Sequence, residues 1–432
     1  MAAPQTGTPV RKPRRRWRWH VPPALVHGNE SLEGSELLDE FSGAAGLALW
    51  QSMRDATLWA GAREPEERAG LFQPGAHEQR LRQIEAAGLD AAIDAPLRAL
   101  AAISRDPGAA REEDILTACR EIADWAQGQM KLGTAIAMAQ AGALAAPTNA
   151  AAGFRVGQLA KLKAEHARAE SWFRRVIGLG RQAKDWASYA EAFLGLGNLY
   201  LDRGNAPAAR RFHIRGLRAA RRHGLRDIQA RALHDLFVIA VNAAPPTEAL
   251  EYARAAFKAY GPTHPKLPVL AHDLAYFWMQ RGRFEQALVV FQGLLPHMAQ
   301  PWERMQNVAD IARAAGAAGN RAAFDEAWQE LWTSAGDWYT RPTASQALLD
   351  MARGAASLKE WALAERAATT SRDVALRREE AKVSIEAETL LDSVSRKRNL
   401  ETAQPAPVGA DEEAEGDVLT ADMVRTLASG RK

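Results

Sequence analysis

The chain has 432 residues, more than one compact hydrophobic core usually holds, so it must contain several domains or an array of repeats. Its 47% hydrophobic and 25% charged residues are typical of a globular protein and exclude wholesale disorder. The single cysteine, Cys119, excludes a disulfide framework and a cysteine-based metal site within one chain.

The first 29 residues are rich in proline and arginine and are expected to form a disordered basic arm. Basic residues from Arg11 to Arg16 stand beside Trp17 and Trp19, a combination that suits single-stranded nucleic acid or an anionic membrane. A flexible solubilising tail explains the composition equally well. Because the arm has no apolar signal-peptide core and the chain has no stretch of about 20 apolar residues, a cytoplasmic protein without a transmembrane segment is expected.

Residues 30–111 are predicted to form a helical region that either caps the following array or continues it as degenerate repeats. Pro65 marks one helix start, since proline suits the first turn of a helix and the acidic residues around it suit the positive end of the helix dipole. Gly88 is expected to end a helix. Further helices are predicted over residues 31–60, 77–87 and 90–104.

Residues 112–400 are periodic. A residue that is small in six of seven cases begins the second helix of each expected hairpin, at spacings of 34, 40, 40, 38, 37 and 40: Ala135, Ala169, Ala209, Ala249, Ala287, Phe324 and Ala364. Twelve residues earlier lies a matching position on each first helix: Ala123, Gly157, Gly197, Phe237, Ala275, Ala312 and Ala352. Five residues before each second-helix position a turn is expected: Met130, Ala164, Gly204, Ala244, Gly282, Gly319 and Lys359. Antiparallel helices approach closely only where side chains are small, so the pattern predicts stacked hairpins.

The pattern resembles the tetratricopeptide repeat family, most closely from Leu196 to Tyr200 with Gly204 and Ala209 after them. The resemblance covers residues 112–380. Most units run 37–40 residues rather than the family's 34, a period found in helical-repeat domains of some bacterial regulators. The resemblance implies an all-α, right-handed solenoid of stacked antiparallel hairpins.

Residues 401–432 are expected to form a linker, an acidic stretch and a short helix. The segment from Asp411 to Asp417 carries five negative charges, and the helix is predicted from Leu419 to Leu427. One hypothesis is that this tail folds back onto a basic surface and competes there with an acidic ligand.

Four aspartates recur two residues before the small position of successive first helices: Asp235, Asp273, Asp310 and Asp350. Where the repeat family commonly has an asparagine that ties neighbouring helices together, these aspartates are predicted to do the same. His234 and His272, or the arginines three residues after the later aspartates, would offset their charge. Metal binding by the two histidines is the less favoured alternative.

The resemblance also implies a concave groove lined by first helices, which would bind a protein or peptide segment. Its predicted lining is Phe154, Gln158, Lys161, Leu194, Asn198, Leu201, His234, Val238, His272, Tyr276 and Met279. An adjacent turn of the solenoid covering this face is the structural alternative.

A basic patch is predicted on one second helix, where Arg211, Arg215, Arg218 and Arg222 recur at steps of four, three and four. The surrounding residues 155–231 hold 17 Lys or Arg and six Asp or Glu, a balance of +11. Such a stripe suits phosphates or an acidic partner, and a solvated arginine face is the alternative.

The sequence therefore favours a non-enzymatic scaffold or adaptor that binds a partner protein. The alternative is a regulatory or nucleic-acid-associated protein that uses the basic arm and patch. An enzyme on a helical scaffold is the least favoured, because no phosphate-binding loop, nucleophile elbow or zinc-protease motif is found. No catalytic residue, metal or cofactor is predicted.

Overall fold

The computed structural model describes residues 35–334, 343–398 and 410–429. The regular elements in these ranges are all helices, which confirms the predicted all-α class. The chain divides into two compact units, Met1–His223 and Gly224–Lys432, and each is described by itself. The predicted basic arm over residues 1–29 lies outside the described residues. None of the described helices is long and apolar enough to cross a bilayer.

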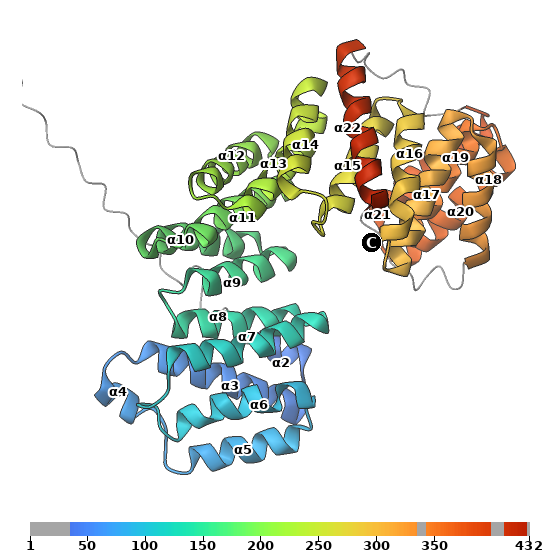
Figure 1. Ribbon diagram of the computed structural model, residues 1–432. Coiled ribbons are helices and arrows are strands. Elements are labelled where there is room, and N and C mark those ends of the chain that lie inside the picture. Colours follow the sequence, from blue (N-terminus) through green and yellow to red (C-terminus); the bar gives the residue numbers. More distant parts are fainter. Residues whose placement is uncertain (1–34, 335–342, 399–409, 430–432) are drawn as a thin grey trace, which may run out of the picture. The chain divides into compact units, whose positions relative to one another are not determined.

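The first unit is a stack of antiparallel helices (Figure 1). Its helices are α2 (Ser35–Glu40), α3 (Gly43–Gly61), α4 (Pro65–Ala69), α5 (Ala76–Ala87), α6 (Ala91–Ala101), α7 (Glu112–Gly128), α8 (Leu132–Ala145), α9 (Ala150–Leu162), α10 (His166–Ala183), α11 (Trp186–Asp202) and α12 (Ala206–Arg222). The helices α7–α8, α9–α10 and α11–α12 form consecutive hairpins, and α3 packs against α5, α6 and α8.

The N-terminal helices α2 to α5 agree with the sequence predictions except at one position. The helix predicted over residues 31–60 is interrupted before Gly43, whose φ of +65° is a left-handed conformation that glycine adopts without strain. Pro65 opens α4 with Glu64 in a capping box, and Gly88 ends α5 in the left-handed region, as predicted.

Glu40 joins the N-terminal helices to the hairpins that follow. Its two carboxylate oxygens accept hydrogen bonds from the backbone N–H groups of Gly133 and Thr134 at 2.8 and 2.7 Å. These groups open α8 and have no acceptor within their own helix, so the carboxylate satisfies them at the positive end of the helix dipole.

The second unit continues the hairpins. Its helices are α13 (Arg226–Ala243), α14 (Pro246–Tyr260), α15 (Leu267–Gln280), α16 (Phe284–Leu294), α17 (Pro301–Ala318), α18 (Arg321–Ser334), α19 (Ala344–Ser357), α20 (Trp361–Arg377), α21 (Ala381–Ser395) and α22 (Ala410–Ser429). The odd-numbered helices α13 to α19 are the first helices of the predicted hairpins.

The repeat register predicted from the sequence is confirmed at both helix positions. The seven second-helix residues from Ala135 to Ala364 are all fully buried, and the matching first-helix residues are all buried. Six of the seven predicted turn residues have φ between +60° and +75°. The exception is Ala244, which is extended because Pro245 follows it and disfavours helical backbone in the residue before.

Small residues allow the closest helix crossings. A Cβ added to Gly197 of α11 would lie 2.3 Å from Nε2 of His213 on α12. A Cβ added to Gly316 of α17 would lie 2.2 Å from the carbonyl oxygen of Gly354 on α19. Any side chain at Gly316 would force α17 and α19 apart, and one at Gly197 would displace the His213 ring or separate α11 from α12.

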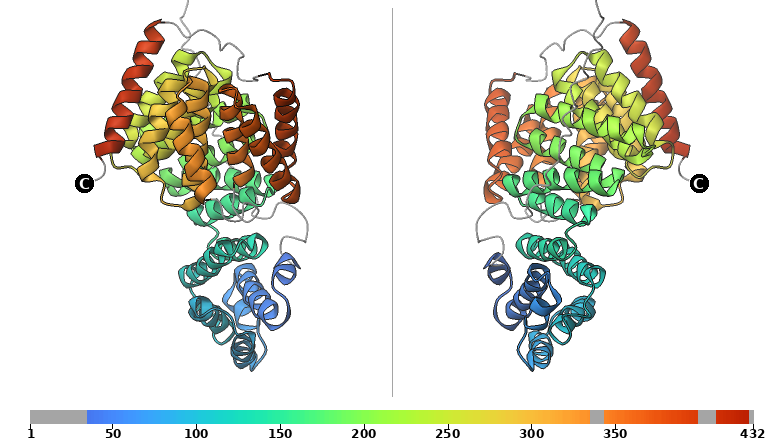
Figure 2. Two further views of the ribbon diagram at one scale, coloured as in Figure 1. Left: turned by 90° about the vertical axis from the view of Figure 1, so that its right-hand side faces the viewer. Right: turned by 90° about the vertical axis from the view of Figure 1, so that its left-hand side faces the viewer.

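The C-terminal helix differs from the sequence prediction. Helix α22 runs from Ala410, so the acidic stretch lies inside a helix that is longer than the predicted Leu419–Leu427. It packs against α14, α15 and α16 of its own unit, beside which it lies in Figures 1 and 2. Gly416 lies against the ring of Trp278, and the indole Nε1 of Trp278 donates to the hydroxyl of Thr420 at 2.9 Å.

Candidate functional site

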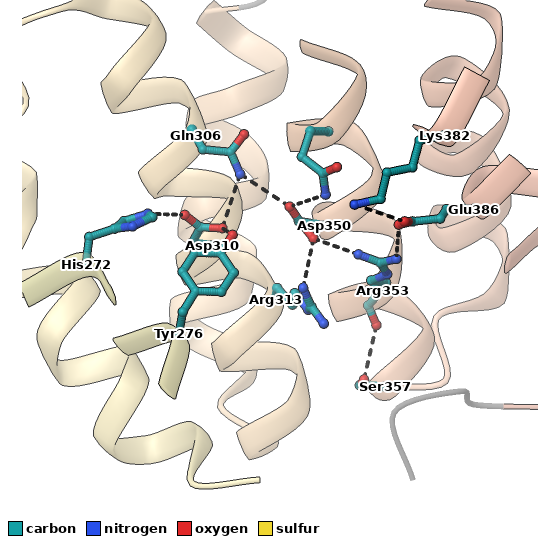
Figure 3. Close-up of polar contacts among 11 residues, drawn as sticks. His272, Tyr276, Gln306, Asp310, Arg313, Asp350, Arg353, Ser357, Lys382 and Glu386 are labelled. Carbon is teal, nitrogen blue, oxygen red and sulfur yellow. Dashed lines mark hydrogen bonds and ion pairs between the residues drawn. The ribbon is translucent and has the colours of Figure 1, made fainter. Parts of the chain in front are cut away.

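A row of paired polar side chains crosses α13, α15, α17, α19 and α21 of the second unit, and Figure 3 shows its part from His272 to Glu386. We call it the polar seam. Its members are His234, Asp273, His272, Tyr276, Gln306, Asp310, Arg313, Asp350, Arg353 and Glu386. The three aspartates meet their partners because each occupies the same register of its helix, two residues before the small crossing position.

His234 on α13 begins the polar seam. Its Nε2 lies 2.7 Å from Oδ2 of Asp273 on α15, and its Nδ1 lies 3.2 Å from the hydroxyl of Tyr260. Burial alone would raise the pKa of Asp273, but hydrogen bonds with His234 and His272 lower it below its ordinary value. Asp273 is therefore ionised at neutral pH and holds α13 to α15.

His272 repeats this arrangement one helix further along. Its Nε2 lies 3.2 Å from Oδ2 of Asp310 on α17, and the hydroxyl of Tyr276 donates to Oδ1 of Asp310 at 2.9 Å. Burial lowers the pKa of His272, but its interactions with Asp273 and Asp310 outweigh that effect and raise the pKa to about 9. Burial, together with the charge of Asp350, raises the pKa of Asp310. The protonated imidazole offsets the charge of the buried carboxylate.

Asp350 on α19 is fully buried and binds two arginines. It accepts hydrogen bonds from Nη1 of Arg313 on α17 and from Nη1 of Arg353 on its own helix, each at 3.1 Å. The predicted pairing three residues apart is confirmed for Arg353, whereas Arg313 reaches across to the next helix. Arg353 also donates to Glu386 on α21 at 2.8 Å, which extends the polar seam to a fifth helix.

Gln306 bridges two carboxylates of the polar seam. Its Nε2 donates to Asp310 at 3.2 Å and to Asp350 at 3.3 Å. Its carbonyl Oε1 is buried and has no hydrogen-bond partner among the described residues. Gln306 was not predicted from the sequence, although a glutamine stands four residues before both aspartates, at Gln306 and Gln346, and Gln346 also donates to Asp350.

These contacts confirm that Asp273, Asp310 and Asp350 tie neighbouring helices together, while the same role of Asp235 stays a prediction. His234 pairs with Asp273, while His272 pairs with Asp310 and also approaches Asp273, with its Nδ1 3.9 Å from Oδ1 of Asp273. Within the described ranges no three His, Cys, Asp or Glu side chains form a group that could hold a metal ion. His272 and Asp273 keep about a third of their side-chain surface exposed, so one edge of the polar seam is open to a ligand.

The predicted groove residues of the first unit lie in different environments. Gln158 is exposed, while Asn198 and Leu201 are half-buried. Lys161 binds Asp202 at 2.9 Å. Phe154 is half-buried, with its ring 5.6 Å from that of Phe173.

Leu194 is buried, because its side chain fills the space beside Gly216 of α12. In the second unit Val238 is half-buried, and His272 and Tyr276 belong to the polar seam. His234 and Met279 are 7% and 8% exposed. Leu194, His234 and Met279 therefore belong to the interior and are not accessible to a partner in this conformation.

The predicted basic patch is exposed on α12. Arg211, Arg215, Arg218 and Arg222 are all exposed and form no ion pair with any described residue. The last three line a cavity of about 660 Å³ within the first unit. Its other lining residues are Arg181, Trp186, Tyr189, Phe193, Ala219 and His223.

The aromatic wall of this cavity was not predicted from the sequence. Trp186, Tyr189 and Phe193 recur at steps of three and four residues, which places them on one face of α11. Helix α12 returns antiparallel, so its last turns lie beside the first turns of α11. The signal was present in the spacing, but each ring alone also fits a core position.

No protein-family model matches the chain, and no curated protein matches it. Solved structures of helical-repeat proteins are similar in part. The apo form of RapI is 13% identical, covers 65% of this chain and 98% of its own, and has a TM-score of 0.44. The Rap conjugation gene regulator of the plasmid pLS20, in complex with the Phr* peptide, is 14% identical, with coverages of 80% and 96% and a TM-score of 0.44. A Rap protein complexed with competence and sporulation factor is 11% identical, with coverages of 81% and 98% and a TM-score of 0.43. At these identities and TM-scores the likeness says nothing about function.

Proposed function

We propose that the chain is a non-enzymatic scaffold that binds an extended segment of a partner protein along its first helices. The observation that supports this proposal is the polar seam, which crosses five helices and keeps one edge open. His272 and Asp273 keep about a third of their side-chain surface exposed, so polar groups of a bound segment would reach the polar seam at this edge.

An extended peptide suits such a row of side chains. Its backbone offers a donor and an acceptor at every residue, about 3.3 Å apart, whatever its sequence. Side chains that alternate along the peptide would then supply specificity through the half-buried apolar residues beside the row. In the first unit Gln158, Asn198 and Leu201 offer the same mixture of polar and apolar groups.

Two matched substitutions test the proposal. Gln158→Arg changes an exposed residue of the first helix α9, and Gln182→Arg makes the same change on the exposed face of the second helix α10. Tagged full-length variants are used for affinity capture from native extract, with nuclease, followed by mass spectrometry. A partner retained by wild type and Gln182→Arg but lost by Gln158→Arg is the expected result. Equal capture by both variants contradicts binding along the first helices.

A second candidate function is supported by the exposed Arg211, Arg215, Arg218 and Arg222 of α12, which form no ion pair with any described residue. A regulatory or nucleic-acid-associated protein would use Arg211 to Arg222 to contact phosphates. Binding of a 20-nucleotide single strand would then weaken steeply with salt, because each phosphate contact releases counterions. Salt-tolerant capture of a protein partner favours the first candidate instead.

A further inference from the structure

The cavity at the end of α12 has two walls of different chemistry. One wall is aromatic and comes from the first turns of α11, with Trp186, Tyr189 and Phe193. The other is cationic and comes from the last turns of α12, with Arg215, Arg218 and Arg222. Its volume of about 660 Å³ lies within the range of small-molecule sites in proteins, roughly 300–1,000 Å³.

The cationic wall is not neutralised by the protein. None of the described residues that line the cavity is acidic. Arg215, Arg218 and Arg222 form no ion pair within the described chain, and Arg215 only lies over the ring of Phe212, 5.7 Å from its centre. Three guanidinium groups spaced by three and four residues point from one helix face and repel one another. An anion bound between them would relieve that repulsion and accept charge-assisted hydrogen bonds.

The aromatic wall offers flat apolar surface next to these charges. The indole of Trp186 stacks on His223 with centroids 4.2 Å apart and planes 7° apart. Tyr189 meets Trp186 edge to face at 5.8 Å and Phe193 edge to face at 5.1 Å. These contacts hold the rings in fixed orientations, as stacking platforms for planar ligands require.

We propose that this cavity binds a nucleoside phosphate, with the phosphate on Arg215, Arg218 and Arg222 and the base against the rings of α11. Inorganic phosphate would use only the cationic wall, and an acidic peptide would have no need of the aromatic wall. The inference deepens the second candidate function, the contact of the arginine face with phosphates, and it is independent of peptide binding along the first helices.

The test uses the full-length chain and isothermal titration calorimetry with three probes: AMP, adenosine and inorganic phosphate. AMP is expected to bind at least about tenfold more tightly than either fragment, because both walls contribute. Arg218→Gln/Arg222→Gln is expected to weaken AMP binding at least about tenfold, since each lost charge-assisted hydrogen bond accounts for roughly that factor. Arg211→Gln is the matched control, because it lies on the same stripe but outside the cavity lining.

A second variant tests the aromatic wall. Trp186→Ala is expected to weaken AMP binding while leaving phosphate binding unchanged, with circular dichroism confirming the helical content. The proposal is overturned if phosphate binds as tightly as AMP. It is also overturned if Arg211→Gln weakens AMP binding as much as the double variant Arg218→Gln/Arg222→Gln does. If the 20-nucleotide strand binds but AMP does not, the arginine face contacts nucleic acid and the nucleotide cavity is wrong.

Discussion

The crossing of α11 and α12 at Gly197 gives the sharpest test of the repeat register. A Cβ on Gly197 would lie 2.3, 2.5 and 2.7 Å from three ring atoms of His213, which is fully buried. Real Cβ contacts are almost never shorter than 3.0 Å. Gly197→Leu adds four carbons at this point, so the ring must leave its position or the two helices must separate.

Overpacking of this kind costs about 1–3 kcal/mol. For a unit of roughly 200 residues each kcal/mol lowers the melting temperature by about 2–4 °C, so a fall of roughly 2–12 °C is expected. His213→Ala removes the clashing ring, and the double variant Gly197→Leu/His213→Ala should therefore lose less stability than the sum of the two single variants.

The assay is thermal unfolding of the full chain followed by circular dichroism. Repeat arrays can unfold in more than one step, so hydrogen exchange of α11 and α12 should locate the loss. Gly128→Leu is the control: Gly128 is exposed at the end of α7, and an added Cβ there meets nothing within 4 Å. If Gly197→Leu has the same melting temperature as Gly128→Leu, the predicted register of α11 against α12 is wrong.

Three further predictions concern the second unit. Asp350→Leu should lower the free energy of unfolding by about 3 kcal/mol in urea titrations, because it leaves two arginines without their shared buried carboxylate; a change under 0.5 kcal/mol would contradict the role of the polar seam. The pKa of His272 is raised from 6.5 to about 9, and this shift adds about 1–3 kcal/mol to the free energy of unfolding. That contribution is fully present below pH 6.5 and is lost as pH rises through 9. In His272→Gln the free energy of unfolding, measured by urea titration, should fall less over that pH range. An unchanged pH profile would refute the raised pKa of His272. Gly416→Leu should displace α22, since a Cβ there would lie 2.3 Å from the ring of Trp278, and hydrogen exchange over residues 417–429 should rise; unchanged protection would contradict the contact.

The repeat register could be predicted because it depends on short-range periodicities. The small crossing residues and the turn residues stand at constant offsets of twelve and five positions, and all of these distances lie within one hairpin. Ala244 departs from the turn pattern for an equally local reason, the proline after it. The position of α22 was not predictable in this way, because it packs against helices more than 100 residues earlier.

The sites were predictable only in part. The aspartates were found from their period, but the partner of Arg313 depends on the distance between α17 and α19. That distance is set by Gly316 and Gly354, which no pattern within one repeat reveals. Leu194 was expected in a groove and is interior, because Gly216 on the next helix leaves room for its side chain.

The polar seam and the arginine face of α12 differ in whether their charged side chains have partners of opposite charge. In the polar seam the charged side chains pair with opposite charges on neighbouring helices, so these charges stabilise the array before any ligand binds. On α12 the like charges stand three and four residues apart without carboxylates, an arrangement that destabilises a helix by about 0.2–0.5 kcal/mol per pair. The preceding second helix avoids this cost, since Glu170 binds Arg174 at 2.7 Å. An anion from outside the described chain would offset the repulsion on α12, which supports anion binding there in addition to the segment binding proposed at the open edge of the polar seam.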